Sequence, residues 1–260
     1  MENKDFFITR IGELITEKKP GEILEILLSL HPQDIAEILN SDYFEQKQKN
    51  VLFRLLKKDL AAQVFVELDN EMQESLIKGF TDSELNSMLE ELFVDDTVDI
   101  IEEMPASVVK RILKNCPKDM RGDINNILAF GSDTAGSIMT PEYIALKSEM
   151  TVKEAFKRIR MEGLDSETVY TCYVIDAQRK LIGVVPLRTL ICADDDATVG
   201  ELMQDDVLSV NTLDDQEEVA NIFKKYNWMA LPVTDKEGRM VGIITVDDIV
   251  DVIEQETTED

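Results

Sequence analysis

The sequence has very little histidine, cysteine and tryptophan, and these shortages exclude several kinds of chemistry. Its 260 residues include one histidine, three cysteines and one tryptophan. The histidine, His31, is followed directly by Pro32, so the chain has no histidine-rich metal site, and a Ser-His-Asp triad is not expected. Cys116, Cys172 and Cys192 lie far apart and form no Cys-x-x-Cys pair, which is typical of buried thiols in a reducing compartment.

Familiar catalytic and phosphate-binding motifs are also missing. The sequence has no G-x-x-x-x-G-K-[ST] loop, no G-x-G-x-x-G after a strand and no G-x-S-x-G nucleophile turn. Asp194-Asp195-Asp196 is followed by Ala197 rather than by the glycine spacing of an EF-hand, which favours a solvated turn over a calcium loop. We therefore expect a protein that is not an enzyme.

Long hydrophobic runs are absent as well. No apolar stretch reaches the roughly 18 residues that a membrane-spanning helix needs. The first residues, Met1-Glu2-Asn3-Lys4-Asp5, show neither the basic nor the apolar part of a signal peptide. From these absences we expect a soluble, cytoplasmic chain.

Basic residues are scarce relative to acidic ones. The chain has 27 Lys and Arg against 53 Asp and Glu, a formal net charge of −26, while 44% of its residues are apolar. The apolar fraction is enough for packed cores, whereas the charge repels nucleic acid and anionic membrane surfaces. Such a chain attracts cations, although plain solubility explains the same balance.

Residues 1–130 show helical periodicity throughout. Apolar residues recur at spacings of three and four, as in Ile23, Leu24, Leu27 and Leu28, and the joints between short helices carry proline or capping residues. Similar sequence segments begin at Asp34, Asp59 and Asp96, and this repetition predicts stacked helix pairs in a superhelical, solenoid-like domain. A plain helical bundle is the alternative.

The second half of the chain contains an internal duplication, because residues 138–191 are repeated at 202–253. Leu181-Ile182-Gly183-Val184-Val185 returns as Met240-Val241-Gly242-Ile243-Ile244. Each copy has the pattern β-α-β-β-α, and each must bury its apolar face against the other. The duplication suggests a cleft between the copies, related by a pseudo-twofold axis, where a ligand can sit.

The duplicated pattern resembles the CBS domain, most clearly over residues 242–249, and the pair resembles a CBS tandem. Residues 30–39, 134–143 and 245–254 look, in this order, like the cytosolic region of the MgtE family of magnesium transporters. That resemblance implies an N-terminal helical superhelix, a CBS pair, a connecting helix and a membrane pore domain. We expect the chain to be the part that precedes the pore, on the cytoplasmic face of the membrane.

These features predict a fold of class α plus α/β, an all-helical superhelical domain followed by two β-α-β-β-α repeats. The expected boundaries are 1–130 for the helical domain, 131–137 for a linker, 138–200 and 201–254 for the two CBS copies, and 255–260 for the start of the connecting helix.

Pairs of acidic residues are candidate magnesium ligands, because Mg²⁺ prefers hard oxygen ligands and is usually held by a few carboxylates and water. Asp95 and Asp99 share one helix face, as do Asp248 and Asp251. The family resemblance implies that acids at these positions bind Mg²⁺, with further acids matching at Asp215, Glu217, Glu256 and Glu259.

Helix capping explains several of these acids without any metal, and spacing alone favours that explanation. Asp95 and Asp96 begin a helix, and Thr245-x-x-Asp248 is close to a capping box. The chain also departs from its relatives at Gln63 and Asn227, where they carry acids. At least one family site is therefore expected to be weakened or lost.

The cleft between the copies is a candidate nucleotide site, with ATP as the second expected ligand after Mg²⁺. The proposed residues are Tyr170 and Trp228 for an adenine, Arg188 for phosphate, and Thr245 with Asp248 for phosphate and ribose. The first copy lacks the Asp of this motif, and Trp228 is equally explained as a packed aromatic.

The resulting interpretation is a magnesium-sensing regulatory domain of a transporter, a homodimer through its CBS pairs, whose partner is the pore domain. The alternatives are a stand-alone CBS sensor of ATP or AMP that regulates a partner protein, and a helical adaptor with a degenerate CBS tail.

Overall fold

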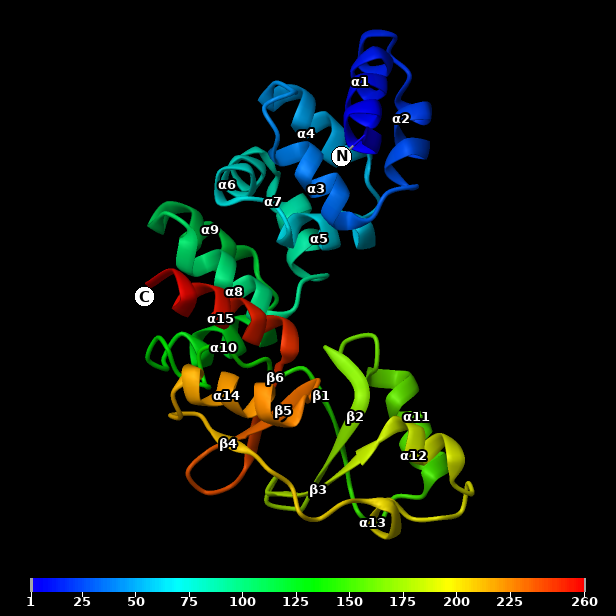
Figure 1. The fold of residues 1–260 in the computed structure, drawn as a ribbon, viewed down its shortest axis with the longest axis vertical. Coiled ribbons are helices and arrows are strands. Elements are labelled where there is room, and N and C mark those ends of the chain that lie inside the picture. The colour runs from blue at the N-terminus through cyan, green and yellow to red at the C-terminus, as the bar shows by residue number, and fades with distance from the viewer. Residues whose placement is uncertain (1, 260) are drawn as a thin grey trace. The chain divides into compact units, whose positions relative to one another are not determined.

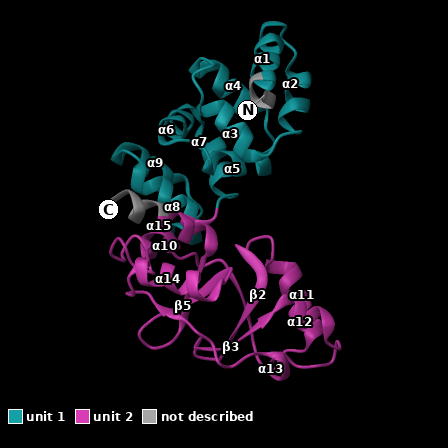
Figure 2. Ribbon diagram, in the orientation of Figure 1, with its two compact units in different colours: residues 1–92, 96–121 teal, residues 93–95, 122–260 magenta. Residues whose placement is uncertain are grey.

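The computed structural model describes the backbone of residues 2–259 and the side chains of residues 6–253. The chain divides into two compact units (Figure 2). The helical unit comprises residues 1–92 and 96–121, and the repeat unit comprises residues 93–95 and 122–260. The chain therefore passes between the units at 92/93, at 95/96 and at 121/122.

Helices follow one another through the first half of the chain, as the periodicity predicts. They are α1 (Glu2–Thr16), α2 (Pro20–Leu27), α3 (Pro32–Asn40), α4 (Gln46–Leu55), α5 (Lys58–Val66), α6 (Asn70–Gly79), α7 (Asp82–Leu89), α8 (Val94–Glu103), α9 (Ala106–Asn115) and α10 (Lys118–Ile127).

The ends of these helices lie where the sequence places proline and capping residues. Pro20 and Pro32 begin α2 and α3, where a missing backbone N–H costs nothing. The side chains of Asp69 and Thr81 accept N–H groups of the first turns of α6 and α7.

The odd-numbered helices of the helical unit form a row in which each packs against the next, α1 on α3, α3 on α5, α5 on α7 and α7 on α9 (Figure 1). This order confirms the superhelical expectation, since in a bundle the helices would share one central core. Phe53, Phe65 and Phe80 fill the centre of the row, with ring centroids 6.0–6.5 Å apart.

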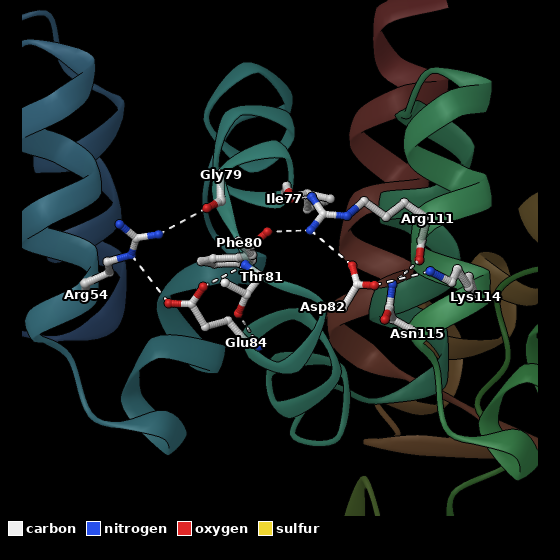
Figure 3. Close-up of polar contacts among 10 residues, drawn as sticks. All are labelled: Arg54, Ile77, Gly79, Phe80, Thr81, Asp82, Glu84, Arg111, Lys114 and Asn115. Carbon is white, nitrogen blue, oxygen red and sulfur yellow. Dashed lines mark hydrogen bonds and ion pairs between the residues drawn. The ribbon is translucent and has the colours of Figure 1, made fainter.

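Two arginines cap the C-terminal end of α6 (Figure 3). Arg54 of α4 donates to the Gly79 carbonyl at 3.1 Å, and Arg111 of α9 donates to the carbonyls of Ile77 and Phe80. Because the last carbonyls of a helix lack intrahelical partners and carry partial negative charge, these guanidinium groups stabilise the end of α6. Acids at the start of α7 pair with both arginines, Glu84 with Arg54 and Asp82 with Arg111, and Asp82 also pairs with Lys114.

The repeat unit contains two copies of one motif. The first is β1 (Tyr143–Leu146), α11 (Val152–Glu162), β2 (Thr168–Ile175), β3 (Leu181–Pro186) and α12 (Leu187–Cys192), followed by a short α13 (Val199–Leu202). The second is β4 (Val210–Asn211), α14 (Gln216–Tyr226), β5 (Ala230–Thr234), β6 (Met240–Thr245) and α15 (Val246–Glu259). Each copy forms a three-stranded sheet whose first pair of strands is parallel and whose second is antiparallel. The β-α-β-β-α expectation is confirmed.

Each copy begins by pairing with the last strand of the other. Thr140 exchanges backbone hydrogen bonds of 2.8 and 2.9 Å with Ile243 of β6, and Gln204 exchanges bonds of 2.9 Å in each direction with Val184 of β3. These equivalent contacts give the repeat unit its pseudo-twofold relation. They also define which residues of the two copies correspond.

Gly183 and Gly242 occupy equivalent positions for a steric reason. A Cβ at Gly242 would lie 2.7 Å from the Thr140 carbonyl oxygen, and one at Gly183 would lie 2.6 Å from Met203 Sδ. The crossing of the two copies therefore requires glycine at position 242 in β6, where the near atom is backbone, while at Gly183 in β3 the Met203 side chain would have to move.

Two elements lie at the boundaries of the second copy. Strand β4 comprises only Val210 and Asn211, and Val207 and Leu208 before it line a pocket. Helix α15 runs without a break from Val246 to Glu259, through the expected junction of the second copy with the connecting helix. Within the described chain, no helix combines the length and the apolar character needed to span a bilayer.

Candidate functional site

A pocket of about 480 Å³ lies between the two copies of the repeat unit. The first copy contributes residues from β2 and the end of β3, and the second contributes the segments 204–208 and 227–232. Three of the five residues proposed for nucleotide binding line it, namely Tyr170, Arg188 and Trp228. The structure thus brings the two aromatic residues and the arginine to one pocket, as the duplication suggests.

The polar and aromatic groups of this pocket suit an anionic ligand with an aromatic base. Tyr170 is 69% exposed, and Trp228 is half-buried beside Tyr226, with ring centroids 5.6 Å apart. Within residues 6–253, the exposed guanidinium of Arg188 forms no hydrogen bond or ion pair. Arg188 is therefore available to a phosphate or carboxylate, which it can bind in a bidentate manner.

Tyr173 also lines the pocket, and its hydroxyl lacks a hydrogen-bond partner among the described residues. The residue is 1% exposed, and no group within the described part of the chain hydrogen-bonds to Tyr173 Oη. Burial raises the pKa of this hydroxyl well above its ordinary value, which keeps it protonated. A buried donor without a partner is costly, so a ligand or water in the pocket that accepts from Tyr173 would relieve that cost. In the sequence, nothing beyond its place on a strand marks this residue.

Thr245 and Asp248, the other two residues proposed for nucleotide binding, do not line this pocket. The Thr245 hydroxyl donates to Asp248 Oδ2 at 2.8 Å, and the Thr245 N–H donates to the same oxygen at 3.2 Å. The Asp248 carboxylate therefore accepts the N–H of the residue before α15, which is half of a capping box, as the capping alternative predicts. Thr245 nevertheless lies beside the pocket wall, because it pairs with Ala230 of β5, which lines the pocket.

Other polar residues of the pocket went unrecognised in the sequence. Asp206 and Gln204 lie on the segment before β4, and Asn227 ends α14 in the left-handed conformation, with φ of 53°. Hydrophobic periodicity does not mark such residues, since they lie between helices and strands. Alignment of the two copies does relate two of them to the first copy, because Gln204 and Asp206 are the counterparts of Thr140 and Glu142.

The acidic residues proposed as magnesium ligands lie on three helices. Asp95 and Asp99 are one turn apart on α8, where Asp95 is buried and Asp99 is exposed. Asp248 and Asp251 lie on α15, and Asp251 is exposed. Asp215 caps α14 by accepting the Glu217 N–H at 2.9 Å, and both of these acids are exposed.

Two of the proposed ligands, Glu256 and Glu259, have side chains outside the described residues. Among the side chains from 6 to 253, no three acidic, histidine or cysteine groups converge as a closed metal site. The exposed carboxylates are nevertheless the hard oxygen ligands that Mg²⁺ accepts, and Mg²⁺ commonly binds one or two carboxylates and keeps several waters. The residues present fit a water-rich magnesium site, not a structural cage.

Comparison with known families agrees with this architecture. The MgtE intracellular N domain matches residues 30–133, and the CBS domain matches residues 135–196 and 199–255.

Similar proteins match over almost the whole chain. It is 38% identical to the magnesium transporter MgtE of Thermus thermophilus over 96% of its length and 32% identical to that of Enterococcus faecalis over 95%. The chain spans 56% and 55% of those relatives, about half of their length.

Solved structures show the same fold. One is described as the cytosolic domain of the Mg²⁺ channel MgtE in complex with ATP, and it aligns with a TM-score of 0.87 and 36% identity over 94% of this chain and 99% of that one. Another, the soluble part of a magnesium transporter, aligns with a TM-score of 0.87 and 30% identity over 97% of this chain and 99% of that one. Given these matches in order along the sequence and in three dimensions, this protein belongs to the MgtE family and carries its N domain followed by its CBS pair.

Proposed function

We propose that this chain is the magnesium-sensing regulatory part of a magnesium transporter and has no catalytic role. The observation that carries the proposal is the 38% identity to a magnesium transporter over 96% of the chain. The excess of 53 acidic over 27 basic residues supports it, since a cation is the ligand that such a surface attracts. On this proposal the chain works at the cytoplasmic face of the membrane, and its partner is the transporter's pore domain.

The proposed mechanism uses electrostatic repulsion between carboxylates. Two carboxylates about 4 Å apart repel each other by about 4 kcal/mol at an effective dielectric near 20. Mg²⁺ held by acids of the N domain and of the CBS pair replaces this repulsion with attraction and closes the gate; at low Mg²⁺ the two domains separate. The proposed ligands are Asp95, Asp99, Asp215, Glu217, Asp248, Asp251, Glu256 and Glu259. The ion shifts the equilibrium only by its different affinity for the two states.

Calorimetric titration of Mg²⁺ into the full chain tests the site assignment. The double variant Asp99→Asn/Asp251→Asn removes one exposed carboxylate from each unit and is expected to weaken Mg²⁺ binding by about tenfold or more. Its matched control is Glu25→Gln/Glu149→Gln, which removes one exposed acid from each unit away from the proposed ligands. Equal loss of affinity in both variants would show a diffuse charge effect and would contradict the assignment.

A second proposed ligand is ATP in the pocket between the copies. The free Arg188 guanidinium and the unpartnered Tyr173 hydroxyl favour it, and a structure of the same family is described in complex with ATP. The one tryptophan, Trp228, lies in this pocket and is a built-in fluorescence reporter. We expect ATP to change its emission in the wild type and to bind far more weakly to Arg188→Ala. An unchanged titration in that variant would exclude the proposed phosphate contact.

We also propose that the protein forms a homodimer through its CBS pair. Met161, Leu164 and Ile191 of the first copy are 69%, 93% and 63% exposed, and large apolar side chains this exposed favour association. Light scattering after gel filtration is expected to give twice the chain mass of 29.5 kDa, and to give the monomer mass for Leu164→Glu/Ile191→Glu. A monomeric wild type would rule out this assembly.

A further inference from the structure

Glu142 lies at the place in the first copy that Asp206 occupies in the second. Thr140 pairs with Ile243 as Gln204 pairs with Val184, so the residues two positions later correspond. Asp206 lines the pocket between the copies. Glu142 therefore marks the corner of the repeat unit that the duplication relates to that pocket.

The carboxylate of Glu142 binds the first residue of helix α8. Its Oε2 accepts the Val94 N–H at 2.8 Å and the Thr140 hydroxyl at 3.1 Å. Val94 is the first residue of α8, where backbone N–H groups lack intrahelical partners and carry partial positive charge. Val94 is 2% exposed and residues 93–95 belong to the repeat unit, so this charge-assisted bond is made away from bulk water.

The two related corners differ in charge. Strand register makes Arg188 of the first copy the counterpart of Asp247, and Pro186 the counterpart of Thr245. The pocket thus has Arg188 at the position that Asp247, next to Asp248, occupies in the corner of Glu142. Acidic residues in that corner repel phosphate, whereas they attract the N-terminus of a helix.

We propose that Glu142 is a positioning residue that anchors residues 93–95 to the repeat unit. One corner of the duplicated module remains open to an external ligand, and the related corner holds the start of the chain's own helix α8. That helix carries Asp95 and Asp99, so the anchor fixes where its first turn begins. The anchoring stands on the contacts above, while its consequence for Mg²⁺ sensing rests on the proposed function.

Amide hydrogen exchange of the full chain without Mg²⁺ tests the anchor directly. Glu142→Ala is expected to speed exchange of the Val94 amide by about tenfold, because the N–H loses its acceptor. Glu142→Gln keeps a side-chain oxygen and is expected to show a smaller increase. The control Glu149→Ala removes an exposed acid seven residues away and is expected to leave Val94 unchanged.

Protection of the Ile243 amide, which donates to Thr140, reports whether the variant keeps the fold. Faster exchange at Val94 with Ile243 still protected supports the anchor. Unchanged exchange at Val94 in Glu142→Ala overturns it, and so does an equal loss of protection at both amides, which would show that Glu142 serves the fold as a whole. In a second measurement, the Mg²⁺ concentration at the midpoint of the Mg²⁺ response is expected to shift severalfold in Glu142→Ala. If the wild type shows no response to Mg²⁺, the proposed function is wrong, while the exchange result still supports the anchor.

Discussion

Thr245 and Asp248 hydrogen-bond each other at the start of α15, with Oγ1 2.8 Å from Oδ2, instead of facing the pocket between the copies. A Thr-x-x-Asp sequence after a glycine-containing strand can have two roles. It can bind the phosphate and ribose of a nucleotide, or it can cap the helix that follows. Here the same oxygen of Asp248 also accepts the Thr245 N–H. The pair therefore stabilises the helix that carries Asp251.

The cap leads to a stability prediction. Thr245→Val keeps the shape of the side chain and removes the hydroxyl that donates to Asp248, and it is expected to lower the free energy of unfolding by about 1 kcal/mol, the usual value of one hydrogen bond. Urea unfolding followed by circular dichroism measures the change. If ATP affinity falls in this variant while stability holds, Thr245 serves a ligand and the capping assignment is wrong.

Removal of the Tyr173 hydroxyl is expected to weaken ligand binding without lowering the stability of the unliganded protein. Tyr173→Phe removes a buried hydroxyl that has no partner within residues 6–253, so the unliganded protein is expected to be as stable as the wild type or more stable by about 1 kcal/mol. A pocket ligand that accepts from this hydroxyl is expected to bind about tenfold more weakly to the variant. A clear loss of stability without ligand would mean that the hydroxyl already has a partner in solution.

Two glycines are expected to respond in opposite directions to alanine. In Gly242→Ala the new Cβ meets the Thr140 carbonyl at 2.7 Å, and we expect a loss of about 1–3 kcal/mol in the free energy of unfolding. In Gly122→Ala, on helix α10, no described atom beyond the helix's own backbone and the neighbouring residues lies within 4 Å of the new Cβ, and we expect a gain of about 0.5–1 kcal/mol. Thermal unfolding of both variants distinguishes these effects, and a Gly242→Ala variant as stable as the wild type would argue against the crossing of the two copies described above.

Capping boxes predict a specific dependence of stability on pH. The Thr151 N–H donates to Glu154 at 2.9 Å and lowers the pKa of this carboxyl below its ordinary value of 4.5. A depressed pKa in the folded state means that the contribution is complete above the unfolded value and is lost as the pH falls through the folded one. The difference in urea midpoint between the wild type and Glu154→Gln is expected to be largest near neutral pH and to vanish in acid. A difference that grows on acidification would reverse the sign of this linkage.

Thiol reactivity checks the burial of the cysteines. Burial raises the pKa of Cys116 to about 11 and that of Cys172 to about 12, whereas Cys192 is exposed. Iodoacetamide at mildly alkaline pH is expected to alkylate Cys192 first and the other two only after unfolding. Peptide mass spectrometry gives the order, and early labelling of Cys172 would contradict the packing of β2.

Much of the architecture could be read from the sequence, because the signals were local. Helical periodicity predicts the row of short helices, and the paired Gly183 and Gly242 mark the duplicated strands. The resemblance to the MgtE family and the fold class are confirmed. The site was harder, since the residues of one pocket come from both copies.

The missed features depend on pairing between distant segments. Trp228 and Thr245 both lie in the second copy, yet of these two only Trp228 lines the pocket, which takes residues from β2 and β3 of the first copy and from the entry segment and β5 of the second. Nothing local in the sequence shows that Glu142 binds Val94, 48 residues earlier. The magnesium ligands remain a prediction, since helix capping accounts for the visible contacts of Asp215 and Asp248.

The central claim is that Mg²⁺ switches the chain between an open and a closed arrangement. Small-angle X-ray scattering of the full chain, with the ionic strength held constant by KCl, tests it most directly when paired with limited proteolysis of the same samples. We predict that Mg²⁺ lowers the radius of gyration and the rate of cleavage together, with one midpoint, and that Asp99→Asn/Asp251→Asn moves this midpoint to higher Mg²⁺ while Glu25→Gln/Glu149→Gln does not. A radius and a cleavage rate that stay constant across the titration would contradict the account.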